Sequence, residues 1–251
     1  MSIEVGAEIG VEVGHVAAVY RYPVKSMRGE RLTSTRVTWT GIEGDRRYAF
    51  VRADDIGHFP WLTARLIPRM LLYQPRCLDP ERPAASDVVV RTPEGRDLPV
   101  DGEALHDEIA GLYRPGAHLL HLGRGAYDSA PISLISTATL RGLGAWLESD
   151  LDPRRFRPNL VLDLAEALPF AEESWLGGLL VFGDRADSAR VRPQRRNQRC
   201  VMITLDPETG NAEPSILRTV AATRETCAGI YGIPEALGTI RAGDRIRLIR
   251  P

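Results

Sequence analysis

A single cysteine follows a dense run of arginines in the second half of the chain. Five arginines lie within residues 190–199, and Cys200 comes directly after them. Nearby guanidinium charge favours a thiolate over a thiol, so this pattern predicts an activated sulfur at Cys200. Such a thiolate serves as a nucleophile or as a metal ligand. The alternative is that Cys200 is an inert core residue at the start of a strand.

The one lysine of the chain marks a second candidate site. Of 32 basic residues, Lys25 is the only lysine and the other 31 are arginines. A lysine retained in such a sequence suggests a tight position that requires a compact ammonium group. Lys25 lies between Pro23, which ends or bulges a strand, and Ser26. An ammonium group beside a hydroxyl suits a phosphate or another anion. The alternative is a solvated strand terminus.

Two further segments bring basic or amide side chains to the ends of predicted strands. Arg46 follows a glycine turn at 41–44, and both Arg157 and Asn159 lie next to the apolar run 160–164. A guanidinium group forks onto a carboxylate or phosphate, and an asparagine amide offers donors and an acceptor to the edge of a ring. The alternatives are surface arginines and an asparagine that holds a turn.

Composition argues against several other classes of site. The three scattered cysteines, Cys77, Cys200 and Cys227, are too few for a disulfide framework or for a four-cysteine zinc or iron–sulfur centre. His118 and His121 lie on an alternating run and should face opposite sides, which argues against a shared metal. The formal net charge of -1 gives no basic field for nucleic acid or a membrane surface. With no signal peptide and no apolar run of about 20 residues, we expect a cytoplasmic protein.

Short strands must position these residues in the first half of the chain. The pattern predicts strands over residues 15–22, 31–40, 48–52, 70–74 and 87–91, and a helix over 103–111. Strands at this spacing indicate an antiparallel sheet or barrel.

The second half mixes strands with longer helices. A helix is predicted over 137–148, with Ser136 as its N-cap, and another over 215–231, with Cys227 on its apolar side. Strands are predicted over 159–164, 179–182 and 201–205, and a final pair lies within 238–249. The clearest boundary between the halves lies near residues 123–131.

Taken in order, the motifs resemble the MOSC family, and within it the mitochondrial amidoxime-reducing components and their bacterial relatives. The resemblance covers residues 15–249. It rests on Tyr22-Pro23-Val24-Lys25-Ser26, Gly44-Asp45-Arg46, Leu62-Thr63-Ala64-Arg65, Leu134-Ile135-Ser136-Thr137, Arg155-Phe156-Arg157-Pro158-Asn159, Pro169-Phe170-Ala171-Glu172-Glu173-Ser174-Trp175, Arg199-Cys200, Asp206-Pro207-Glu208-Thr209-Gly210 and Gly243-Asp244.

The resemblance implies a β-rich α+β fold with a few short helices. Two coupled β-barrel-like domains are expected, an N-terminal MOSC barrel domain over 13–123 and a MOSC domain over 124–251, with a cofactor cleft between them. It also implies the molybdenum cofactor, with Cys200 as the catalytic residue and metal ligand. The positions that match cofactor contacts are Lys25, Ser26, Arg46, Ser136, Thr137, Arg157, Asn159 and Arg199.

The implied activity is reduction of an N-hydroxylated or N-oxygenated small molecule. We expect electrons from a separate ferredoxin, flavoprotein or cytochrome-type protein, because no ferredoxin-like extension follows Ile249. One alternative is a sulfurtransferase that carries a persulfide on Cys200, and another is a cofactor carrier without catalysis. Pyridoxal phosphate binding is a further association of the family. The sequence departs from the amidoxime reducers at Gln198, where they usually carry a second cysteine, and in a shorter connection at 123–131.

Overall fold

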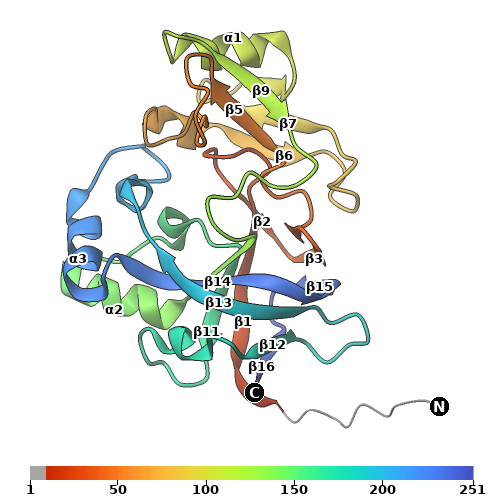
Figure 1. The fold of residues 1–251 in the computed structure, drawn as a ribbon, viewed down its shortest axis with the longest axis vertical. Helices are drawn as coiled ribbons and strands as arrows, with labels where there is room; N and C mark the ends of the chain where they lie inside the picture. The colour runs from red at the N-terminus through yellow and green to blue at the C-terminus, as the bar shows by residue number, and fades with distance from the viewer. Residues whose placement is uncertain (1–9, 251) are drawn as a thin grey trace.

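Seven strands close into a barrel in the lower part of Figure 1. The computed structural model describes residues 10–250. Strand β16 pairs with β1 and β1 pairs with β11, so the ring has no free edge. Strand β2 (Glu30–Leu32) extends the sheet beyond β1. The order around the barrel is β1 (Val11–Arg21), β11 (Leu160–Leu164), β10 (Ile132–Ser136), β14 (Cys227–Ala236), β13 (Arg190–Gln198), β12 (Leu179–Phe182) and β16 (Arg245–Ile249).

Strand β1 shows how local sequence allows the barrel to close. Val16 and Val19 are buried in the barrel core, and a bulge between Val16 and Ala18 shifts the register against β11. Gly14 lies at φ +146, and a Cβ atom there would lie 2.1 Å from the carbonyl oxygen of Asp163. Glycine at this position therefore permits the close approach of β1 and β11.

Helices cover one side of the barrel. Helix α2 (Thr137–Leu147) connects β10 to β11, which form a parallel pair, as such a crossover requires. Helix α3 (Pro214–Arg224) packs against α2 over a cluster that includes Leu143 and Val220. The short 3-10 helices η2 (Pro153–Phe156) and η3 (Ala171–Trp175) complete the connections of this half.

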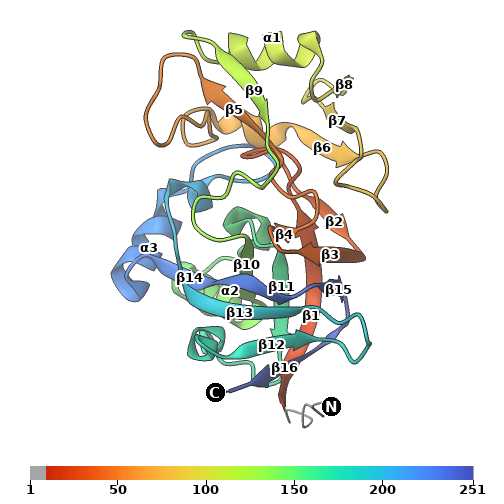
Figure 2. The same ribbon diagram turned by 45° about the vertical axis from the view of Figure 1, so that its right-hand side comes forward.

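Smaller sheets form the upper part of the molecule and have their own core (Figures 1 and 2). Strand β5 (Tyr48–Arg52) pairs with β9 (Ala117–His121), and helix α1 (Glu103–Gly111) contacts β9. A three-stranded sheet contains β6 (Gln74–Cys77), β7 (Val88–Arg91) and β8 (Asp97–Pro99), and the 3-10 helix η1 (Pro68–Leu72) precedes it. A further three-stranded sheet, β15 (Gly238–Arg241), β3 (Ser34–Thr38) and β4 (Gly41–Ile42), lies beside the barrel, and its residues Val37, Ile42 and Ile240 are buried in the barrel core.

The predicted β-rich class is confirmed, but the expected pair of barrels is not. Within residues 10–250 one barrel closes, whereas the remaining sheets have two or three strands and end in free edges. Strand β1 completes the barrel although it belongs to the first half of the chain. The division into 13–123 and 124–251 stays a prediction. No helix of the described chain is long and apolar enough to span a bilayer.

Three local predictions were wrong. Residues 201–205, predicted as a strand, form the 3-10 helix η4 (Val201–Thr204), and most of 70–74 lies in η1. The helix predicted over 215–231 ends at Arg224, because Glu225 and Thr226 both adopt left-handed backbone conformations, with φ of 53° and 62°. Cys227 therefore begins strand β14.

Candidate functional site

A cleft of about 560 Å³ lies between the barrel and the upper sheets. Eight basic side chains and a single carboxylate, that of Asp128, line it. Walls with this excess of positive charge attract anions. The structure brings seven predicted site residues to this cleft: Lys25, Ser26, Arg46, Arg157, Asn159, Arg199 and Cys200.

Cys200 is the one cysteine of the three that lines the cleft. It follows the arginine-rich strand β13 rather than starting a strand, and it caps the helix η4. The backbone is held on both sides, because the amide of Arg199 donates to the Thr226 carbonyl at 2.7 Å and the Cys200 carbonyl accepts from the Ile203 amide at 3.2 Å. The half-buried sulfur is thus fixed at the cleft wall.

Arg199 is held by neutral groups alone. Its Nε donates to the Ala228 carbonyl at 2.8 Å, and its Nη1 donates to the Phe156 carbonyl at 2.7 Å. With the Asn197 amide turned to match its neighbours, Oδ1 accepts from the guanidinium group at 3.0 and 3.2 Å. No carboxylate within residues 10–250 pairs with it. Burial lowers the pKa of Arg199 to about 10, so the group stays charged at neutral pH and favours an anionic partner.

A buried tyrosine ring contacts two further guanidinium groups. The ring centroid of Tyr22 lies 4.3 Å from Arg157 and 4.8 Å from Arg46. Arg46 pairs with Asp45, which also accepts the Tyr22 amide at 2.7 Å. Arg157 donates through Nη1 to the Met27 carbonyl at 2.8 Å, but its buried Nη2 has no hydrogen-bond partner among the described residues. Burial lowers the pKa of Arg157 to about 10.

Lys25 is buried at the opposite wall of the cleft. Its Nζ donates to the Ala126 carbonyl at 2.7 Å and to the carboxylate of Asp128. The rings of Phe59 and Trp61 lie 5.7 and 5.8 Å from the ammonium group. Burial lowers the pKa of Lys25, and the charge of Asp128 opposes that shift. This narrow position between two aromatic rings agrees with the expectation that residue 25 requires a compact ammonium group.

Ser26 and Asn159 lie in the cleft with constrained geometry. Ser26 is buried and adopts a left-handed backbone conformation, with φ of 66°. Oδ1 of Asn159 accepts the Ser133 amide at 3.1 Å, and Nδ2 donates to the Tyr20 carbonyl at 3.3 Å. Asn159 therefore joins β1 to β10, which agrees with the alternative of a structural asparagine.

Ser136 and Thr137 do not line the cleft. Oγ of Ser136 accepts the Thr139 amide at 2.9 Å and donates to the buried carboxylate of Glu172 at 2.9 Å. Thr137 donates to Asp163 at 2.7 Å. The Glu172 side chain thus lies at the start of α2. Ser136 is the N-cap of α2, and Thr137 joins its first turn to β11, so a cofactor contact at these two residues stays a prediction.

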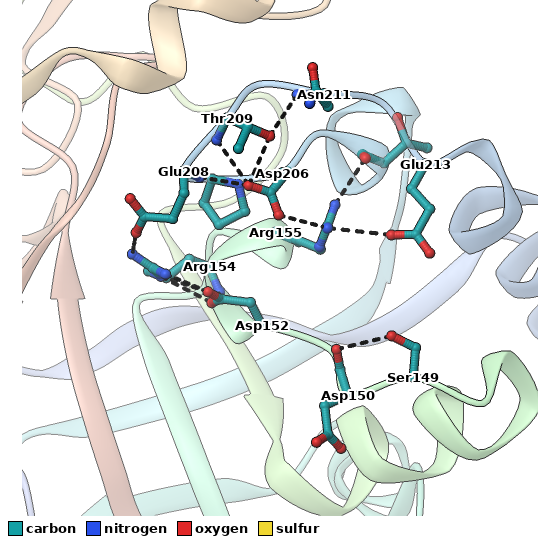
Figure 3. A network of polar contacts seen from close by, with 12 residues as sticks. Ser149, Asp150, Asp152, Arg154, Arg155, Asp206, Glu208, Thr209, Asn211 and Glu213 are labelled. Carbon is teal, nitrogen blue, oxygen red and sulfur yellow. Dashed lines mark hydrogen bonds and ion pairs between the residues drawn. The ribbon is translucent and has the colours of Figure 1, made fainter. Parts of the chain in front are cut away.

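An ion-pair network fixes the segments that carry Arg157 and Cys200 (Figure 3). Arg155 of η2 donates to Asp206 at 2.9 Å and to the Thr204 carbonyl, also at 2.9 Å. Its neighbour Arg154 pairs with Glu208 at 2.6 Å. Glu208 also accepts from Arg28 of the upper part of the molecule, at 2.7 Å. The network therefore ties the turn after η4 to η2 and to the first half of the chain.

The sequence analysis missed several residues of the site. Tyr22 belongs to one of the motifs, but its contacts with two guanidinium groups depend on the fold. Asp45 and Asp128 are single acidic residues in the loops after β4 and before β10. Asn197 carried the best signal, because asparagine occurs only three times in the chain. Tyr231 was assigned to a helix and instead faces the cleft from β14.

Comparison with known proteins gives a consistent set of matches. The MOSC domain matches residues 119–247, and the MOSC N-terminal beta barrel domain matches residues 13–113. Mitochondrial amidoxime reducing component 2 of Rattus norvegicus is 27% identical, over 94% of this chain and 83% of that protein. Mitochondrial amidoxime-reducing component 1 of Homo sapiens is also 27% identical, over 95% of this chain and 84% of that protein.

Among solved structures, the YUAD protein of Bacillus subtilis aligns with a TM-score of 0.49 and 13% identity, over 94% of this chain and 95% of that chain. The names of the matched proteins mention neither pyridoxal phosphate nor sulfur transfer. The curated relatives are named as mitochondrial, so a cytoplasmic location stays a prediction for this chain.

Proposed function

The chain belongs to the MOSC family, which is known for binding the molybdenum cofactor, and on that premise we propose that the cleft binds this cofactor. One observation carries the proposal. The cleft joins one accessible thiol, that of Cys200, to two half-buried guanidinium groups that have no carboxylate partner, those of Arg157 and Arg199. Buried charges of this kind are costly unless an anion pairs with them. A phosphate-bearing metal cofactor supplies both the anion and a partner for sulfur.

The residues of the cleft fit the two ends of such a cofactor. We assign Cys200 as the molybdenum ligand, because a thiolate suits a soft metal site. Arg157 and Arg199 hold the phosphate, and the orphaned Nη2 of Arg157 offers it a hydrogen-bond donor. Lys25, Ser26 and Arg46 line the same cleft and add to its positive charge. Asn159 acts indirectly by joining the strands that carry these groups.

We further propose that the chain is a reductase of N-hydroxylated or N-oxygenated compounds, as the names of its relatives suggest. When bound, the cofactor supplies two-electron oxygen-transfer chemistry. In reduction of an amidoxime the N–O bond breaks, the substrate gains two electrons and two protons, and an amidine and water form. The electrons come from a separate donor protein of the ferredoxin, flavoprotein or cytochrome type. The protein itself binds and orients the substrate and cofactor.

Metal content tests the proposal directly. The protein is purified from a host that makes the molybdenum cofactor, and molybdenum per chain is measured by elemental mass spectrometry. We expect nearly one molybdenum per wild-type chain and a loss of most of it in Cys200→Ser. Cys227→Ser is the matched control, because Cys227 does not line the cleft and should leave the metal content unchanged.

The alternative sulfurtransferase predicts a different result. Wild-type protein without molybdenum, but with an extra sulfur on Cys200 that a thiol reductant removes, would refute the cofactor proposal. Intact-protein mass spectrometry before and after reduction detects that sulfur. Stoichiometric molybdenum without reduction of any amidoxime by a small-molecule electron donor would refute the reductase proposal and leave a cofactor carrier.

A further inference from the structure

The eight cations of the cleft differ in how their charge is neutralised. Three arginines have carboxylate partners of their own. Arg46 pairs with Asp45, Arg155 with Asp206, and Arg196 with Glu173 at 2.9 Å and Glu225 at 2.7 Å. These three arginines serve the structure of the walls.

Two cations share one carboxylate at the upper wall. Asp128 pairs with Lys25 and lies 3.6 Å from Arg65. The guanidinium group of Arg65 also stacks on the partly exposed ring of Phe59 at 4.5 Å. One positive charge on this wall therefore stays uncompensated, next to an apolar face that is open to an incoming molecule.

Arg195 is the one basic residue lining the cleft that has neither a carboxylate partner within residues 10–250 nor a role assigned above. Its side chain is exposed and makes no hydrogen bond or ion pair with any residue of the described chain. Strand β13 places it opposite Tyr231 of β14, and both residues line the cleft. Its neighbour Arg196 is held by two carboxylates. Arg157 and Arg199 have no carboxylate partners either, but they are less exposed than Arg195 and are assigned above to the cofactor phosphate.

An exposed guanidinium group at the wall of a cleft keeps its hydration until a ligand arrives. It therefore adds nothing to the stability of the fold and remains available for a charged group that enters from solvent. A cofactor phosphate on the buried arginines leaves this charge unused. The geometry thus separates an inner anion position, at Arg157 and Arg199, from an outer one at Arg195.

We propose that the substrate of this cleft carries an anionic group, a carboxylate or a phosphate, and that Arg195 binds it. This inference rests on the proposed reductase function, because it names the substrate class of the same site. The N-hydroxylated or N-oxygenated end of the substrate enters the cleft, and its anionic end remains at Arg195. Arg195 is thus a specificity-determining residue.

Matched substrates test this inference. Benzamidoxime and 4-carboxybenzamidoxime are reduced with a small-molecule electron donor, which removes any contribution from docking of a donor protein. We expect wild-type kcat/KM to favour the carboxylate by about tenfold, as one charge-assisted hydrogen bond predicts. In Arg195→Gln this ratio should fall to about one, with the loss in KM. Arg195→Lys should retain part of it, because the charge remains.

Two controls keep the result specific. Arg218→Gln removes an exposed arginine of α3 that does not line the cleft, and it should keep the wild-type ratio. Arg195→Glu should reverse the preference, so that 4-(aminomethyl)benzamidoxime becomes better than 4-carboxybenzamidoxime. Molybdenum content is measured for every variant, so that loss of cofactor is not mistaken for loss of specificity.

The substrate inference and the proposed function fail in different ways. If wild-type protein reduces both amidoximes without preference, or if Arg195→Gln slows both equally, the inference is overturned and the reductase function stands. If neither compound is reduced, the reductase function fails. Calorimetry with 4-carboxybenzamidine and benzamidine then decides the inference by binding alone: equal affinities, or a preference that survives Arg195→Gln, overturn it.

Discussion

Neighbouring arginines in and after η2 differ in whether a carboxylate neutralises their charge. Arg154 and Arg155 face the turn after η4, where carboxylates neutralise both (Figure 3). Arg157, at the end of the same short helix, turns into the cleft and is bound by a backbone carbonyl and an aromatic ring only. Arg199, on the facing wall, has the same neutral surroundings.

The difference shows how the chain separates structure from binding. Paired arginines hold segments together at little net electrostatic cost. Unpaired buried arginines keep their charge for a ligand and lower the stability of the ligand-free fold, because desolvation is not offset. The chain places its ligand charges where the fold supplies only neutral partners.

The largest expected effect comes from removing an unpaired arginine. Arg157→Met should weaken cofactor binding roughly 100-fold, because a buried charge contact is worth several kcal/mol. Molybdenum per chain measures the loss. The free energy of unfolding of ligand-free protein, from urea denaturation, should stay unchanged or rise. If the ligand-free variant is clearly less stable, Arg157 stabilises the fold as Arg155 does, and the proposed difference between the two arginines is wrong.

The paired arginine should give the opposite result. Arg155→Met leaves Asp206 and Glu213 without their cation and should lower the free energy of unfolding by about 2 kcal/mol. This is below the value for a fully buried pair, because both carboxylates are partly exposed. Urea denaturation measures the change. Metal content per folded chain should fall less than in Arg157→Met. An equal fall would show that paired and unpaired arginines contribute alike to cofactor binding.

The pH dependence of binding of an inorganic anion to the cofactor-free protein tests the unpaired arginines further. Inorganic sulfate, which keeps the same charge across this pH range, should stabilise the wild-type protein by about 1.4 kcal/mol at ten times its Kd, measured as a shift in Tm. Burial lowers the pKa of Arg157 and Arg199 to about 10, so the cost of burying their charge is present below that pH and disappears above it. The stabilisation should therefore be constant from pH 6 to 9 and decline above about pH 10. Arg157→Met should show little stabilisation, and a full response in that variant would place the anion elsewhere.

Tyr22 separates the contribution of its ring from that of its hydroxyl. The hydroxyl donates to the Pro158 carbonyl at 3.0 Å, and burial raises the pKa of Tyr22, so the group stays protonated. Tyr22→Phe should lower the free energy of unfolding by about 1 kcal/mol and keep the metal content. Tyr22→Leu also removes the aromatic face beside Arg46 and Arg157, so its metal content should fall. Equal metal content in both variants would exclude a role for the ring.

The smallest effect is expected at the exposed edge of the network. Glu208 bridges Arg28 and Arg154, but half of its side chain is exposed. Glu208→Gln should therefore lower the free energy of unfolding by only about 0.5 kcal/mol, and less at high salt. Urea denaturation at two salt concentrations measures this. A loss near that of Arg155→Met would show that the network acts as one cooperative unit.

Much of the cleft was predictable because its residues occupy unusual sequence contexts. Lys25 is unique of its kind, and Cys200 follows an arginine run, so composition alone singled them out. Ser136 and Thr137 are expected in the site because their positions match cofactor contacts of the family. The sequence does not reveal that Glu172, 36 residues later, returns to the start of helix α2.

The errors in secondary structure have a similar physical origin. Val201-Met202-Ile203-Thr204 has the composition of a strand, but the segment forms a short 3-10 helix that buries Ile203 and Thr204 and leaves Val201 exposed. At the end of α3, Glu225 and Thr226 adopt left-handed conformations that neither residue favours intrinsically. Tertiary contacts impose that reversal, so no local pattern announces it.

The closure of β1 against β16 also sets the order of events during synthesis. Strand β1 leaves the ribosome early, whereas its partner β16 occupies residues Arg245–Ile249. The barrel therefore has no complete ring until β16, the last of its strands in the sequence, has been translated. Until then β1 exposes an unpaired edge, a period in which the nascent chain is vulnerable to misassociation and benefits from chaperones.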